Sequence, residues 1–368
     1  MTGRSTVGRR GYQAQRRRGR GSRRRVVRRS RLRILAWITA VVVVLGVTGA
    51  AALAYRLSSN IRSVDINSAL DKERPAPADN GAMNILILGS DSRAEKTKTG
   101  KEPARSDTAM VVHVYTGRRQ AALVSIPRDT LITRPSCTTA SGAKDPGGAR
   151  KMFNESYSVG GPACAVDTVE RMSGLRMDHY IELDFTGFKK IIDKLGGVTV
   201  TTSKSIKDPA SGLNLTAGTH TLNGTQSLGL VRTRKSVGDG SDLGRIQLQQ
   251  AFVKALLAQV RQGGVLSNPA RLFSLADTAT KSMTTDKDLA GTAALVRFAS
   301  ALKDIDSSGL QALTLPVGPD TKDANRVVPL TTESRQVWEA LRTDQPVPTT
   351  ATARSMGDKG STGALITP

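Results

Sequence analysis

The sequence is poor in the side chains that most enzymes use as nucleophiles or as soft metal ligands. Its 368 residues include two cysteines, three histidines and 4% aromatic residues. The histidines, His113, His179 and His220, are scattered along the chain, and His113 lies in an expected strand. No Gly-x-Ser-x-Gly elbow, His-Glu-x-x-His pair or Walker loop is present. The groups that remain for catalysis are carboxylates and arginines, together with a hard metal ion that carboxylates can bind. These are the components of phosphoryl transfer.

The first 33 residues lack acidic side chains and contain fourteen arginines, so they carry +14 of the net charge of +23. Such a run binds phosphates, either those of nucleic acid or those of anionic lipid headgroups. No helix-turn-helix or zinc-finger spacing accompanies it, and Tyr12 is its only aromatic residue. We therefore expect residues 1–33 to form a cytoplasmic tail that contacts membrane lipids and binds no nucleic acid.

Residues 34–55 lack charge and are rich in Val, Ala, Leu and Ile. At about 1.5 Å per residue they are long enough for a hydrocarbon core of roughly 30 Å. A cleaved secretory signal is the alternative, but its apolar region is normally only about 7–15 residues long. By the positive-inside rule, an uncleaved span places the amino terminus in the cytoplasm and the rest of the chain outside the cell membrane.

Beyond the span, composition predicts three segments. Residues 56–81 are polar and contain Pro75 and Pro77, which indicates a linker that lifts the next domain off the membrane. Residues 82–343 alternate strand-like and helix-like patterns, which is typical of an α/β fold. Residues 344–368 are rich in Thr, Ser, Gly and Pro, and we expect a disordered tail.

The two cysteines, Cys137 and Cys164, both fall in the part of the chain expected outside the membrane. A disulfide is permitted in that compartment, and two lone cysteines are a poor metal site. The segment between them contains several glycines and reads as a mobile surface loop. We therefore expect a disulfide that tethers this loop.

Three β-like runs, residues 83–88, 108–115 and 120–126, end in charged turns. If residues 117–118 form a two-residue turn, paired positions in the second and third runs sum to 235. Asp107 then lies opposite Arg128. If the first strand is antiparallel to the second, Asp91 reaches the same end of the sheet.

This arrangement would bring two carboxylates and three guanidinium groups together. The residues are Asp91, Asp107, Arg93, Arg105 and Arg128. Mg²⁺ takes one or two carboxylates and leaves its other positions to water and phosphate oxygens, and guanidinium groups bind phosphate through paired hydrogen bonds. The pattern therefore predicts a phosphate site with Mg²⁺, or Mn²⁺ in its place. Ordinary solvated ion pairs at strand ends are the alternative.

A second basic set follows near two expected helices, residues 224–231 and a long helix that opens at residues 241–242. It consists of Arg232, Arg234, Arg245 and Gln249. Because helix amino termini favour anions, these side chains are candidate phosphate contacts. Asp242 either orients one of the arginines or stabilises the start of its helix. A solvated basic loop is the alternative.

Six segments resemble, in order, the motifs of the LytR-CpsA-Psr family. They are ILGSDSR at 87–93, RSDT at 105–108, SIPRD at 125–129, DFTGF at 184–188, LGGV at 195–198 and GSDLGR at 240–245. The resemblance covers about residues 82–343. It implies a mixed central sheet flanked by helices in an αβα sandwich, with a hydrophobic cleft for a lipid and one preceding membrane helix.

Members of that family transfer glycopolymers from polyprenyl-pyrophosphate carriers onto peptidoglycan in Gram-positive bacteria, using Mg²⁺. The resemblance therefore implies a membrane-anchored phosphotransferase, with Asp91, Asp107 and Arg128 catalytic and the two carboxylates serving the metal. The pyrophosphate contacts would be Arg93, Arg105, Arg128, Arg232, Arg234, Asp242, Arg245 and Gln249. The polymer would be similar to a teichoic acid, a capsule or an arabinogalactan.

Two other functions fit the same residues. A pyrophosphatase would hydrolyse the lipid carrier with water as the acceptor. A membrane-anchored regulator or lipid-sensing module would bind the lipid without chemistry. The products formed with and without a peptidoglycan acceptor separate these possibilities.

Overall fold

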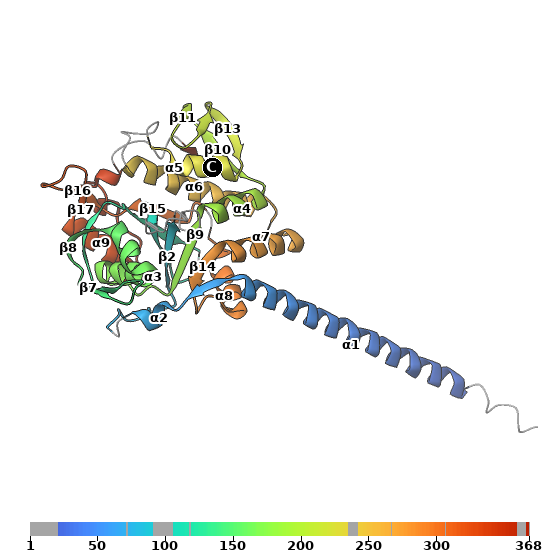
Figure 1. Ribbon diagram of the computed structural model, residues 1–368. Coiled ribbons are helices and arrows are strands. Elements are labelled where there is room, and N and C mark those ends of the chain that lie inside the picture. Colours follow the sequence, from blue (N-terminus) through green and yellow to red (C-terminus); the bar gives the residue numbers. More distant parts are fainter. Residues whose placement is uncertain are drawn as a thin grey trace, which may run out of the picture. The chain divides into compact units, whose positions relative to one another are not determined.

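A computed structural model describes residues 21–70, 73–90, 106–117, 119–234, 242–265, 267–305, 307–358 and 366–367 (Figure 1). The chain divides into two compact units between Tyr55 and Arg56. Helix α1, Gly21–Asn60, runs through the first unit and ends in the second. Within it, Leu35–Asn60 is the one helical stretch of the described chain that is long and apolar enough to cross a membrane. The sequence predicts this span at residues 34–55.

A seven-stranded mixed sheet forms the centre of the second unit. Its order is β1 (Arg62–Val64), β14 (Met283–Asp286), β9 (His179–Asp184), β2 (Met83–Ser90), β3 (Ser106–Val114), β4 (Ala121–Ile126) and β15 (Leu310–Thr314). Strands β2, β3 and β4 are antiparallel neighbours, whereas β9 and β15 are parallel to β2 and β4. The predicted mixed sheet is confirmed.

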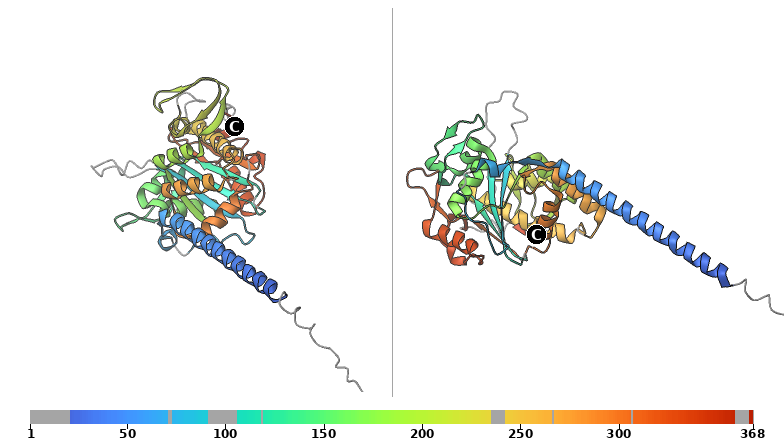
Figure 2. Two further views of the ribbon diagram at one scale, coloured as in Figure 1. Left: turned by 90° about the vertical axis from the view of Figure 1, so that its right-hand side faces the viewer. Right: turned by 90° about the horizontal axis from the view of Figure 1, so that it is seen from below.

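Helices cover both faces of the sheet, as expected for strands whose side chains alternate between faces. In β3, Val111 packs on one face, and α3 (Phe153–Ser173) and α9 (Thr331–Arg342) pack there too. Its neighbour Met110 packs on the other face, where α6 (Asp242–Gln262) and α8 (Thr292–Leu302) contribute side chains. Figures 1 and 2 show these layers.

Smaller elements complete the unit. The helices are α2 (Ile66–Ala69), α4 (Phe185–Leu195), α5 (Gly224–Arg232), α7 (Pro269–Ser282), η2 (Thr349–Ala351) and η3 (Met356–Asp358). A three-stranded sheet joins β13 (Gly218–Leu222), β10 (Val198–Thr202) and β18 (Ile366–Thr367). The two-stranded pairs are β11 (Ile206–Asp208) with β12 (Leu213–Leu215), β16 (Val317–Pro319) with β17 (Val327–Pro329), β5 (Leu131–Arg134) with β8 (Gly148–Met152), and β6 (Cys137–Thr138) with β7 (Lys144–Asp145).

The predicted linker at residues 56–81 is partly folded onto the domain. Its strand β1 pairs in parallel with β14, so it forms one edge of the central sheet. Farther along, the guanidinium of Arg74 donates to both carboxylate oxygens of Glu170, at 2.6 and 2.8 Å, and both side chains are buried. The prediction of a spacer is wrong for these residues. Their partners lie far away in the sequence, so no local pattern indicates that they pack on the domain.

The predicted disordered tail at residues 344–368 also packs on the domain where it is described. Val347 and Ala351 are buried in the core beneath α9. Gln311 of β15 donates to the carbonyl of Val347 at 2.8 Å and accepts from its amide at 3.2 Å. The prediction of disorder is therefore wrong for the residues around Val347 and Ala351, which pack on the domain although the composition of the segment is polar.

Cys137 and Cys164 form a disulfide with Cα atoms 5.5 Å apart. It ties β6 to α3 where that helix is interrupted at Gly160 and Gly161. A Cβ atom on Gly160 would lie 2.7 Å from Cys164 Cβ, so glycine lets the backbone pass close to the disulfide. The enclosed segment is not only a loop, because β7 and β8 lie within it.

Replacing both cysteines with serine is expected to lower the free energy of unfolding by about 3–4 kcal/mol, because the unfolded chain regains the freedom of a closed loop. Denaturant unfolding of the full chain in detergent measures this. Reduction of the wild type should cause the same loss. Equal stability of the oxidised wild type and the serine variant would contradict the expectation.

Candidate functional site

The strand register brings two of the predicted site residues together. Ala109 pairs with Ile126 and Val114 with Ala121, so paired positions sum to 235 as predicted. The same pairing places Asp107 beside Arg128, whose Nη1 donates to Asp107 Oδ1 at 2.7 Å. The antiparallel arrangement of β2 and β3 is also confirmed, with Ser90 paired to Ser106. Asp91, Arg93 and Arg105 lie outside the described residues.

Arg128 faces three carboxylates. Besides Asp107, its Nε lies 3.4 Å from Asp129 Oδ2 and 3.7 Å from Asp242 Oδ1. Burial acts to lower the pKa of Arg128, but the hydrogen bond to Asp107 and the charges of Asp242 and Asp129 raise it above its ordinary value. The guanidinium is therefore a fixed positive charge that holds the Asp107 carboxylate in place.

Asp242, the first residue of α6, lies among three arginines. Its Oδ1 pairs with Nη2 of Arg245 one turn later, and it lies 3.7 Å from both Arg128 Nε and Arg234 Nη2. Burial raises the pKa of the Asp242 carboxyl, although the three arginines act to lower it. Burial also lowers the pKa of Arg245 despite its pairing with Asp242. The geometry favours the role of orienting the arginines.

A cavity of about 320 Å³ adjoins this cluster. Its lining comprises Asp107, Thr108, Phe185, Ala210, Ser211, Val231, Arg232, Arg234, Arg245 and Gln249. Gln249 donates to Thr108 Oγ1 at 3.1 Å and to the Val231 carbonyl at 3.0 Å, while Arg245 Nη2 donates to the Asp107 carbonyl at 3.1 Å. Asp107 of the first predicted set therefore lines the same cavity as the four residues of the second set, and it is the only acidic residue among the described lining residues.

Three residues near this site, Phe185, Asp129 and Arg326, were not predicted as site residues from the sequence. The guanidinium of Arg232 lies 4.9 Å from the ring centre of Phe185, which fixes its position against α4. Arg326 Nη1 lies 3.4 Å from Asp129 Oδ1, on the far side of that carboxylate from Arg128. Asp129 and Phe185 fall in motifs that the sequence does display, but Arg326 has no local signal because its partner is almost two hundred positions away.

The residues present fit a divalent cation held together with a phosphate-bearing ligand. Among the described residues no three His, Cys, Asp or Glu side chains form a metal-binding group. Asp107, whose side chain is one-third exposed, supplies a hard oxygen donor beside arginines suited to phosphate. Mg²⁺ commonly binds in this way, using one or two carboxylates and the phosphates of the substrate.

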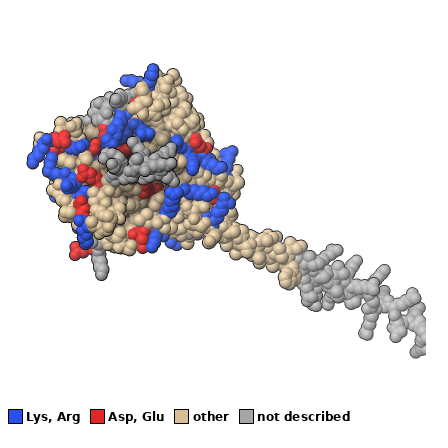
Figure 3. All heavy atoms as spheres, viewed as in Figure 1, with Lys and Arg blue, Asp and Glu red and all other residues tan. Residues whose placement is uncertain are grey.

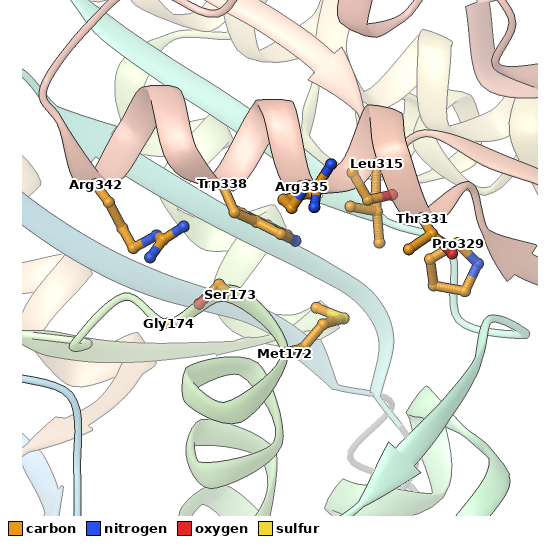
Figure 4. Close-up of a pocket in the computed structure, with 10 residues that line it drawn as sticks. Met172, Ser173, Gly174, Leu315, Pro329, Thr331, Arg335, Trp338 and Arg342 are labelled. Carbon is orange, nitrogen blue, oxygen red and sulfur yellow. The ribbon is translucent and has the colours of Figure 1, made fainter.

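A second cavity, of about 330 Å³, lies between the end of α3 and α9 (Figure 4). Arg335, Trp338 and Arg342 project into it from α9, opposite Met172 and Ser173 (Figure 4). None of the predicted site residues lines this cavity. The candidate site is therefore the arginine-lined cavity beside Asp107.

Comparison with known proteins identifies the family. The model of the LytR_cpsA_psr family matches residues 53–343. The chain belongs to this family. Among its relatives, the cell wall biosynthesis protein LcpA of Corynebacterium glutamicum is 33% identical over 305 residues, which are 75% of this chain and 58% of LcpA. The chain thus spans little more than half of that relative.

Other family members support the same assignment. The polyisoprenyl-teichoic acid--peptidoglycan teichoic acid transferase TagT of Bacillus subtilis is 31% identical over 61% of this chain and 66% of TagT. A LytR-Csp2A-Psr enzyme from Actinomyces oris matches the structure with a TM-score of 0.57 and 26% identity, over 76% of this chain and 95% of that chain. TagT bound to LI-WTA, 24% identical with a TM-score of 0.55 over 75% of this chain and 98% of that chain, shares the fold.

Proposed function

We propose that this protein is a membrane-anchored phosphotransferase that moves a glycopolymer from a polyprenyl-pyrophosphate carrier to peptidoglycan. The observation that carries the proposal is the cavity in which Arg232, Arg234 and Arg245 surround a space that Asp107 enters. Three guanidinium groups and one carboxylate suit a pyrophosphate and a divalent cation better than a neutral ligand. The relative TagT is a polyisoprenyl-teichoic acid--peptidoglycan teichoic acid transferase, which supports the same reaction.

Each group has a role in the proposed reaction. The cavity arginines and Gln249 bind the pyrophosphate, and Arg128 orients Asp107. Mg²⁺, or Mn²⁺, when bound by Asp107 and Asp91, would neutralise charge on the phosphates. A sugar hydroxyl oxygen of the acceptor attacks the phosphorus that bears the glycan, forming one P–O bond as the bridging P–O bond breaks. Polyprenyl phosphate leaves with the bridging oxygen, and the hydroxyl proton passes to Asp107 or Asp91.

The anchor helix and its charges support a location at the cell membrane. Leu35–Asn60 is long and apolar enough to cross it. The fourteen arginines that precede residue 34 favour a cytoplasmic amino terminus and an extracytoplasmic domain. This orientation would place the cavity on the side where peptidoglycan is assembled, and the arginine tail against the inner lipid headgroups.

The test is an assay of the full chain in detergent with a polyprenyl-pyrophosphate-linked oligosaccharide and Mg²⁺, with and without peptidoglycan. We expect glycan attached to peptidoglycan only when acceptor is present, and loss of transfer when the cation is chelated. Free glycan phosphate formed equally without acceptor would identify a hydrolase instead. Lipid binding with no product under either condition would leave only the sensing role.

A further inference from the structure

The large hydrophobic side chains exposed in the described chain have an uneven distribution. Apart from residues of the anchor helix α1, only two are exposed, Leu272 at 42% and Val296 at 61%. Leu272 lies on α7, which leads into β14, and Val296 lies on α8, which follows β14. In Figure 1, α7 and α8 lie beside β14, the strand next to the edge strand β1 of the central sheet.

Helix α7 is held by the last residues of α1, which follow the uncharged run at residues 34–55. Arg56 Nε lies 3.1 Å from Asp277 Oδ1, and Asn60 Nδ2 donates to the same oxygen at 3.1 Å. The Arg56 guanidinium also lies 6.0 Å from the ring centre of Phe273. Because Arg56 is the first charged residue after the uncharged run, these contacts hold α7 beside the residues where the chain leaves that run.

Only a few residues connect the uncharged run to the central sheet. Arg62, only six positions after Arg56, already belongs to β1 and pairs with Thr284 of β14. Even a fully extended chain covers no more than about 3.3–3.6 Å per residue, so this edge of the sheet stays within about 20 Å of Arg56, the residue that ends the uncharged run. The start of the predicted linker at residues 56–81 therefore keeps the domain close to the end of the uncharged run.

Positive charge borders the two exposed apolar side chains. Arg271 precedes Leu272 and Arg297 follows Val296, and all four side chains are exposed. The chain after residue 33 carries +9, and Lys and Arg cover more of the face in Figure 3 than Asp and Glu do. Exposed apolar residues flanked by cations are typical of helices that lie in a membrane interface and attract anionic headgroups.

We propose that α7 and α8 form a membrane-docking surface, centred on Leu272 and Val296 and flanked by Arg271 and Arg297, that lays the domain on the lipid leaflet from which α1 emerges. The inference rests on α1 crossing the membrane, as in the proposed function, but it needs no catalysis. Its occupant is a phospholipid surface with anionic headgroups. Docking would hold the arginine-lined cavity at a fixed height above a lipid-linked substrate.

A single fluorescent label tests this. Both native cysteines are in the disulfide, so Val296→Cys supplies the only free thiol in the full chain. The labelled chain is reconstituted into vesicles of anionic and zwitterionic lipid that contain a nitroxide-labelled lipid as quencher. We expect at least about a twofold loss of emission, because an interfacial helix buries its apolar face about 5–10 Å into the headgroup region. The matched control, Asn214→Cys on the exposed side of β12, should change little.

Further outcomes decide between occupants of the surface. Adding Leu272→Asp to the labelled chain should reverse the quenching, whereas adding Asn214→Asp should leave it, provided that both variants unfold at the wild-type temperature. Equal quenching at positions 296 and 214 would overturn the proposal. So would emission that depends on protein density rather than on the quencher, since a second copy would then cover α8. Failure of the chain to float with the vesicles would also overturn it, and none of these readouts depends on transfer activity.

Discussion

Asp107→Ala is expected to lower the rate of glycopolymer transfer by about 10²–10³-fold, the size of effect seen when one preorganised electrostatic group is removed from an active site. Asp107 is the only acidic residue among the described residues that line the arginine-rich cavity. Its removal takes away the described oxygen donor for the cation and leaves Arg128 without its 2.7 Å hydrogen bond. Transfer by the full chain in detergent with Mg²⁺ measures the loss.

Two control variants separate charge from shape. Asp107→Asn keeps a hydrogen-bond acceptor for Arg128 but removes the negative charge, so it should be nearly as inactive as alanine if the carboxylate holds a cation. Asp79→Ala removes an exposed carboxylate away from the cluster and should leave transfer unchanged. Binding of a polyprenyl-pyrophosphate ligand should survive in the Asp107 variants, because the cavity arginines remain. Near-normal transfer by Asp107→Asn would exclude the carboxylate as metal ligand or base.

The centre of this site could be predicted from local sequence because hairpin geometry is local. The register predicted for β3 and β4 is the one observed, and the register alone places Asp107 opposite Arg128. Helical spacing likewise puts Arg245 and Gln249 on one face of α6, and both line the cavity. The short helix predicted at residues 224–231 is confirmed as α5, Gly224–Arg232.

What the sequence did not reveal depends on contacts between distant segments. The edge strand β1 is short and polar, and it becomes a strand only because β14, more than two hundred positions later, offers a pairing edge. Val347 is buried in the core and its backbone is hydrogen-bonded to Gln311, and Arg326, just before β17, lies against Asp129. No local pattern distinguishes such residues from a polar linker, a tail or a surface loop.

Asp242→Ala is expected to lower the free energy of unfolding by about 3–5 kcal/mol, because removing one member of a buried ionic group leaves its partners uncompensated. Arg245, whose side chain is only 5% exposed, would lose its close partner, while Arg128 and Arg234 would face it as like charges. Denaturant unfolding of the full chain in detergent measures the loss. Glu339→Ala, which breaks an exposed pair with Arg342 on α9, should cost less than about 1 kcal/mol.

A double-mutant cycle shows whether Asp242 acts through the arginines. If its role is to neutralise Arg245, then Asp242→Ala with Arg245→Ala should be more stable than the sum of the single losses predicts, by roughly 0.5–3 kcal/mol. Strict additivity would exclude this coupling. Asp242→Asn should keep much of the packing yet weaken pyrophosphate binding, since the arginines would repel one another out of position. A variant that folds normally and binds normally would show instead that the arginines hold their places without a counter-ion, and that the substrate's own phosphates are enough to gather them.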